Sequence, residues 1–194
     1  MLSYAEVFKT VCVDAAYYTF PSQKYLAGLT GQVPTDFQFA FKVTDEVTVK
    51  KFPNLARFGN RAGQSNEHFL NVQLFSDAFL RPCEPFRGQI GLLMFEFSRF
   101  YPSDYEHGRE FVADLDGFLG QLPKGWPYGV EMRNKHWLEP DYFACLARHA
   151  VTHVYNPWNA SPCSRQQRRR VGRCLRGKAG NRIVPHRHPE KRAL

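Results

Sequence analysis

Short apolar runs alternate with segments of helical periodicity along the first 158 residues. Each apolar run is bounded by turn-forming residues, and the runs predict strands at 10–18, 37–43, 90–97, 128–133 and 151–155. Helical spacing predicts helices at 25–29, 66–80, 105–122 and 139–149, and the polar stretch 44–65 predicts an extended loop. Nearly continuous apolar strands are typical of a parallel sheet covered on both faces, so the pattern predicts an α/β fold, as a barrel or an open sheet.

Charged side chains stand near the carboxyl ends of the first four predicted strands. Because side chains alternate across a strand, the charge shares a face with small residues in three of these strands, opposite a bulky face. The carboxyl ends of parallel strands are where such folds place their functional sites. These candidate site residues are Asp14, Lys42, Glu96, Glu131 and Arg133.

Three carboxylates and two cations in one opening suit two kinds of ligand. Lys42 and Arg133 could bind a phosphate or a carboxylate, while the carboxylates could bind a polyol or hold a divalent cation through oxygen ligands. The same spacing also fits a structural salt-bridge network at the mouth of the fold. Trp137 is a candidate pocket wall, and His153 and Asn156 near the last strand are either further site residues or ordinary core and loop residues.

Familiar local motifs are missing from the sequence. It contains no Gly-rich phosphate loop, G-x-S-x-G elbow, H-E-x-x-H or C-x-x-C, so nucleotide-binding and zinc-protease interpretations have no local support. No apolar run reaches about 18 residues, which predicts no transmembrane helix, and the charged start does not fit a signal peptide. We therefore expect a cytoplasmic protein, in which the five cysteines are reduced thiols.

The net charge of +8 belongs to the end of the chain. Residues 1–158 hold 15 Lys+Arg and 17 Asp+Glu, whereas residues 159–194 hold 11 Lys+Arg, one acid and no aromatic residue. The sequence therefore predicts a domain at 1–158 and a basic, disordered tail at 159–194.

Three interpretations of the tail remain open. Its arginines could contact nucleic acid weakly and without sequence preference. A metal site is a second possibility, although the spacing of its ligands misses the usual zinc patterns. The residues of this possible metal site are Cys163, Cys174, His186 and His188. The third interpretation, which we favour, is that the tail is the product of a reading-frame shift in the coding DNA.

Four strand segments resemble the YecE-like family, also called domain of unknown function 72. They read F-K-T-V-C-V-D-A-A-Y-Y-T-F-P (8–21), F-Q-F-A-F-K-V (37–43), G-L-L-M-F-E-F-S (91–98) and Y-G-V-E-M-R-N (128–134), within a resemblance that covers about 4–158. The resemblance implies a TIM-barrel-like fold, here partial because five strands cannot close a barrel of eight. No activity is established for the family.

The resemblance also bears on individual positions. Lys42, Glu131 and Arg133 match the family's strand-end residues. The first motif departs from it, with Cys12 and Asp14 where many members have Glu and Asn. Two further departures are Glu96 in place of Gln and Thr48-Val49 in place of Thr-His.

Together these observations predict a small-molecule enzyme, a hydrolase or isomerase of a phosphorylated or sugar-like substrate, or a remnant inactivated by truncation. Lys42 and Arg133 would hold negative charge, and Glu131 would be the acid/base. Asp14 and Glu96 would orient the substrate or share a divalent cation. The alternative is a non-catalytic ligand-binding protein whose tail touches nucleic acid.

Overall fold

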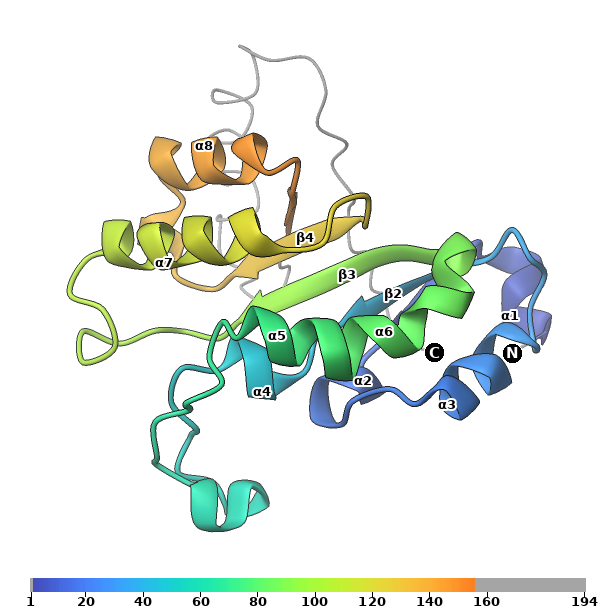
Figure 1. The fold of residues 1–194 in the computed structure, drawn as a ribbon, viewed down its shortest axis with the longest axis horizontal. Helices are drawn as coiled ribbons and strands as arrows, with labels where there is room; N and C mark the ends of the chain where they lie inside the picture. The colour runs from blue at the N-terminus through green and yellow to red at the C-terminus, as the bar shows by residue number, and fades with distance from the viewer. Residues whose placement is uncertain (1, 156–194) are drawn as a thin grey trace, which may run out of the picture.

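The computed structural model describes residues 2–155, in which five strands form one sheet (Figure 1). All neighbouring strands run parallel, and their order in the sheet follows their order in the chain. This confirms the predicted α/β fold with five parallel strands. Sequential order is the order of a (β/α) barrel, whereas doubly wound sheets reverse direction at a switch point. The strands are β1 (Thr10–Val13), β2 (Gln38–Lys42), β3 (Ile90–Phe97), β4 (Tyr128–Met132) and β5 (Thr152–Val154).

Helices fill the connections between the strands. The predicted helices at 25–29, 105–122 and 139–149 are present as α3, α7 and α8. The helices in chain order are α1 (Leu2–Val7), α2 (Ala15–Tyr18), α3 (Gln23–Thr30), α4 (Asp45–Thr48), η1 (Ala56–Arg61), α5 (Val72–Leu74), η2 (Phe75–Leu80), α6 (Arg81–Cys83), η3 (Glu84–Gln89), α7 (Gly108–Gln121), η4 (Lys135–Trp137) and α8 (Pro140–Arg148).

The main core lies between the helices and one face of the sheet. Phe39 and Phe41 of β2 and Phe95 of β3 are fully buried there, and the rings of Phe75 and Phe118 pack against Phe95. This is the bulky strand face that the alternation of side chains predicts. The aromatic contacts hold the helices against the sheet and so fix the positions of the loops at the strand ends.

The opposite face of the sheet carries small and aliphatic side chains. Leu92, Met94 and Val154 form a separate buried cluster on this face. Gly129 of β4 lies between them, and a Cβ atom at this position would approach Leu92 and Val154 to 2.9 Å. The absence of a side chain at Gly129 therefore lets β4 pack closely between its neighbours in the sheet.

The first strand is shorter than predicted. β1 ends at Val13, and residues 15–18 form the helix α2 instead of continuing the strand. Alanine is the strongest helix former, so the Ala15-Ala16 pair suits α2. Asp14 consequently lies in the turn after β1 and not within the strand.

The segment 44–80 also differs from its prediction. The expected extended loop contains α4 and η1, and the expected helix from Asn66 begins only after Asn71, whose side chain accepts a hydrogen bond from the Leu74 amide. Asn66 does not cap this helix, because its side-chain amide donates to the Glu46 carbonyl at 2.8 Å and to the Val49 carbonyl at 2.7 Å. These contacts span about 20 residues and leave no periodic signal in the sequence.

None of the helices between residues 2 and 155 is long and apolar enough to cross a membrane. Asn156 and the predicted tail at 159–194 lie outside the described residues, and so do the tail's candidate nucleic-acid contacts and metal ligands.

Candidate functional site

The structure brings the five charged residues of the strand ends together. Lys42 is the last residue of β2, and Asp14 and Arg133 lie in the turns directly after β1 and β4. Glu96 and Glu131 occupy paired positions on β3 and β4. Because the strands are parallel, all five side chains meet at one edge of the sheet, as the spacing predicts.

The five side chains form a row in which anions and cations alternate. Lys42 Nζ lies 2.9 Å from Asp14 Oδ1 and 3.0 Å from Glu96 Oε2. The other oxygen of Glu96 accepts a hydrogen bond from Arg133 Nη2. Arg133 Nε lies 3.7 Å from Glu131 Oε1. Each cation thus bridges two carboxylates that come from different strands, and we call this set the charged row.

Burial differs among the members of the charged row: Glu96 and Glu131 are buried, the two cations are partly exposed, and Asp14 at one end is exposed. The side chains of Glu96 and Glu131 are 7% exposed, those of Lys42 and Arg133 are 20% and 38% exposed, and that of Asp14 is 66% exposed. Burial alone would lower the pKa of Lys42, but its hydrogen bonds to Asp14 and Glu96 outweigh burial and hold the pKa above its usual value. Lys42 is therefore a fixed positive charge.

Cys12 lies beside the charged row and is not activated by it. Its thiol lies 3.9 Å from Asp14 Oδ1. Burial is the main cause that raises the pKa of Cys12 to about 12, and the negative charge of Asp14 adds to it. The thiol consequently stays protonated near neutral pH and is a poor nucleophile.

The charged row is a poor site for a divalent cation. Lys42 and Arg133 already neutralise the carboxylates that the sequence suggested as ligands. Within residues 2–155, the one group of His, Cys and carboxylate atoms close enough to hold a metal ion lies elsewhere, between α7 and α8. There His149 Nε2 and Arg148 Nη1 lie 2.8 Å and 2.5 Å from the same oxygen of Asp116, with Cys145 as the third member of the group. The Arg148 guanidinium opposes a cation at that position.

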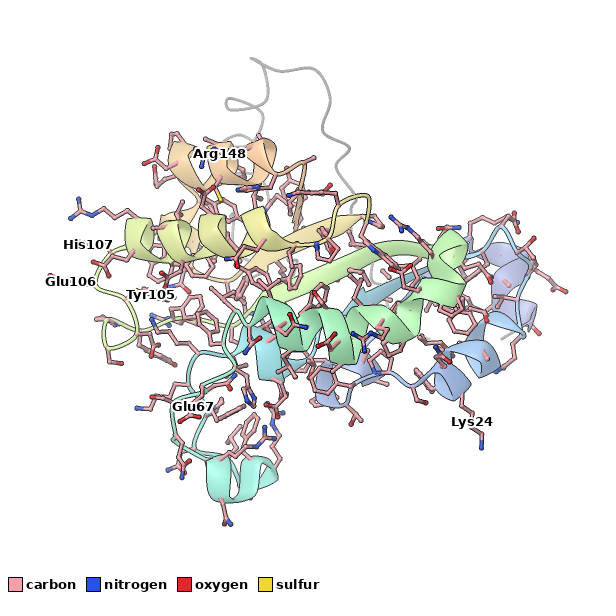
Figure 2. All side chains as sticks on the ribbon, in the orientation of Figure 1. Lys24, Glu67, Tyr105, Glu106, His107 and Arg148 are labelled. Atoms are coloured by element: carbon pink, nitrogen blue, oxygen red, sulfur yellow. The ribbon has the colours of Figure 1, made fainter. Side chains whose placement is uncertain are left out.

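A pocket of ≈550 Å³ lies between the loops that follow β3 and β4, and Arg133 lines it. Trp137, the candidate pocket wall, lines this pocket and also packs on Phe100 with ring centroids 5.6 Å apart. Figure 2 labels Tyr105, which lies at the end of the loop from β3 and lines the same pocket. Gly108 leaves room for Trp137, because a Cβ atom there would lie 2.6 Å from the indole ring.

A second pocket, of ≈770 Å³, lies between the loop after β2 and the loop after β3, and we call it the loop pocket. Both loops leave the sheet at the left of Figure 1. Tyr17 and Ser98 line this pocket and hydrogen-bond to each other. Burial, together with the charge of nearby Glu96, raises the pKa of Tyr17 to about 12. Tyr17 and Ser98 therefore connect the loop pocket with the charged row.

These two pocket residues differ in how well the sequence indicates them. Ser98 lies two positions after Glu96, so the alternation of strand side chains already placed both on one face. Tyr17 was assigned to a strand, and the four-residue helix α2 that turns it towards Ser98 has no periodicity that could be recognised.

His153 does not belong to the charged row. It pairs with Val130, which faces the helices, and its Nδ1 lies 3.0 Å from the hydroxyl of Tyr142 on α8. Burial lowers the pKa of His153 to about 4, so the imidazole is neutral near pH 7. This agrees with the simpler of the two sequence interpretations, in which His153 is a core residue.

Comparison with known proteins gives a family and a fold. Residues 1–189 match the family model described as "Protein of unknown function DUF72", so the match extends past residue 158. Two crystal structures of a DUF72 family protein from Enterococcus faecalis V583 are similar to this chain. The first has a TM-score of 0.52 at 20% identity and covers 78% of this chain and 56% of the other. The second has a TM-score of 0.52 at 19% identity and covers 78% and 51%.

The chain thus spans about half the length of these two solved structures. None of the curated proteins matches it.

Proposed function

The chain belongs to the DUF72 family of proteins of unknown function, and from this premise we propose that it is a small-molecule enzyme acting at the carboxyl ends of β1–β4. The observation that carries the proposal is the charged row. Four consecutive strands each deliver ionised groups to one edge of the sheet, and two carboxylates of the row are 7% exposed. Burying charge costs free energy, so a row of this kind is typical of a functional site.

The geometry supports separate roles for the members of the row. Lys42 and Arg133 are held in place by two carboxylates each, so they are positioned to bind a phosphate or another negative group of a substrate. Asp14 and Glu96 orient these cations. Glu131 is the acid/base in this proposal, because its carboxylate is 7% exposed and lies 3.7 Å from Arg133, the cation that would hold the substrate.

The reaction classes that suit these groups are hydrolysis and isomerisation of a phosphorylated or sugar-like compound. In hydrolysis, Glu131 would accept a proton from the attacking water, the bond to the leaving oxygen would break, and that oxygen would take a proton from solvent water. In isomerisation, Glu131 would move a proton between neighbouring carbons of a sugar phosphate. Lys42 and Arg133 would stabilise the negative charge that develops in either case.

The test uses the full-length chain and the variant Glu131→Gln, which keeps the shape of the side chain. The probes are 4-nitrophenyl phosphate and 4-nitrophenyl glycosides for hydrolysis, and aldose phosphates followed by NMR for isomerisation. We expect turnover of at least one probe and a loss of about 100-fold or more in Glu131→Gln.

Glu84→Gln is the matched control, because that side chain is 52% exposed and lies in η3, before the amino end of β3, so its turnover should equal the wild-type value. A wild-type chain that turns over none of these probes, or Glu131→Gln at the wild-type rate, overturns the proposal.

A ligand-binding protein without catalysis is the second candidate function. The observation that favours it is the mutual pairing within the charged row, since both cations already contact two carboxylates. Isothermal titration with inorganic phosphate and ribose 5-phosphate distinguishes the two candidates. Binding that Arg133→Gln weakens, without turnover of any probe, would support the binding protein.

A further inference from the structure

The loop pocket has a volume of ≈770 Å³, which lies in the range of small-molecule binding sites. One wall comes from residues 48–64, after β2, and the other from residues 98–104, after β3. Lys50 ties the walls together, because its Nζ donates to the Asp104 carbonyl at 2.9 Å and lies 3.3 Å from the centre of the Tyr105 ring. Two loops that are far apart in sequence therefore form one pocket before any ligand arrives.

The lining of the loop pocket carries a strong excess of positive charge. Four cationic side chains line it, against the single carboxylate of Asp104. Lys50 is held by the contacts described above, but Lys51, Arg57 and Arg99 form no ion pair within residues 2–155. A pocket lined by four cations and a single carboxylate attracts an anion, and its partly enclosed position strengthens that attraction.

Aromatic rings stand next to these cations. Arg99 lies 5.6 Å from the ring centre of Tyr101, and Arg57 lies 4.8 Å from that of Phe58. Phe58 is buried in the small cluster that supports the loop after β2, whereas Tyr101 is 58% exposed. Tyr101 is thus available to stack on a flat ring of a ligand, such as a nucleobase.

We propose that the loop pocket binds a mononucleotide, with its phosphate on Arg57 and Arg99 and its base against Tyr101. The inference rests on the proposed function and names its substrate class, because Tyr17 and Ser98 connect the pocket to Glu96 of the charged row. Recognition here uses side chains from two loops and therefore needs no Gly-rich phosphate motif.

The test compares three ligands on the full-length chain by isothermal titration. AMP carries phosphate and base, ribose 5-phosphate lacks the base, and adenosine lacks the phosphate. We expect AMP to bind at least about tenfold more tightly than either of the others, and more weakly as salt is added. Equal affinities for AMP and ribose 5-phosphate would refute the role of the base.

Single substitutions assign the binding to the loop pocket. Arg57→Gln and Arg99→Gln should each weaken AMP binding about tenfold, since each removes one charge-assisted contact. Tyr101→Leu should reduce the advantage of AMP over ribose 5-phosphate by about fivefold or more. Lys24→Gln is the matched control for lost charge, because Figure 2 places Lys24 on α3, away from both loops, and it should bind AMP normally.

Two further outcomes would overturn the inference. The first is AMP binding that survives Arg57→Gln and Arg99→Gln but disappears when Arg168, Arg169 and Arg170 are changed to Gln. The second is binding of a short single-stranded oligonucleotide without any binding of AMP.

The proposed function can fail separately from this inference. If AMP binds in the loop pocket but Glu131→Gln does not alter turnover, the proposed catalytic role fails and the inference stands. If sugar phosphates are turned over with dependence on Glu131 while AMP does not bind, the inference alone fails.

Discussion

The ion pair between Lys42 and Glu96 gives the sharpest prediction about stability. Its atoms lie 3.0 Å apart, and the side chains are 20% and 7% exposed. At that distance Coulomb's law gives an attraction of about 1.4 kcal/mol in bulk water and about 5.5 kcal/mol at an effective dielectric constant of 20. Partial burial places the pair between these limits, and desolvation removes part of the gain. We therefore expect a net coupling of about 1.5–3 kcal/mol.

A double-mutant cycle measures this coupling. The variants are Lys42→Met, Glu96→Gln and both together, and the readout is the free energy of unfolding in urea at pH 7. Lys42 also contacts Asp14, and Glu96 also contacts Arg133, but the cycle subtracts these other contacts to first order. The change in unfolding free energy of either single variant would combine the contributions of all these contacts.

The chain supplies a matched control in Lys9 and Asp36. That pair lies 3.3 Å apart, but its side chains are 72% and 66% exposed. Exposed pairs are screened by water, so the cycle of Lys9→Met and Asp36→Asn should give a coupling below about 0.5 kcal/mol. If the coupling of Lys42 with Glu96 is no larger than that of the control, the charged row does not hold its members as the geometry implies.

Three further predictions concern single positions. The pKa of His153, about 4, is below its unfolded value of 6.5. The stability that neutral His153 contributes is therefore present above pH 6.5, and the free energy of unfolding falls by up to about 3 kcal/mol as the pH drops to 4. In His153→Leu, the urea midpoint should fall less over the same pH range. Ala150 has φ 56°, a backbone conformation in which glycine is preferred. Ala150→Gly should therefore raise the free energy of unfolding, measured by urea titration, by about 0.5–1 kcal/mol. A decrease would contradict this. The thiols of Cys12, Cys83 and Cys145 have pKa values raised to about 12 by burial, so mass spectrometry should find them alkylated far more slowly at pH 8 in the native chain than in urea.

The charged row was predictable because only local rules are needed to find it. Alternation along each strand places Glu96 and Glu131 on one face, and parallel order places Lys42 at the same edge of the sheet. The sequence could not show which carboxylate each cation contacts. Those pairings depend on the register between β3 and β4, which sets Glu96 opposite Glu131.

The loop pocket was not predictable for a different reason. Its walls come from segments that lack periodicity, and they are joined by contacts between residues about 50 positions apart, such as that of Lys50 with Asp104. The hydrogen bonds of Asn66 to Glu46 and Val49 likewise depend on the folded path of the loop. Such contacts are set by tertiary structure, and no single segment of the sequence carries them.

The order of the strands in the sheet has a consequence for synthesis of the protein. Each of the strands β2 to β5 pairs with the strand made just before it, so a partner is already present when each of these strands is synthesised. Residues 10–42 can form the first parallel pair while the third strand is still being translated, and each later β-α unit adds to an existing edge. A nascent chain can therefore grow its sheet in the direction of translation.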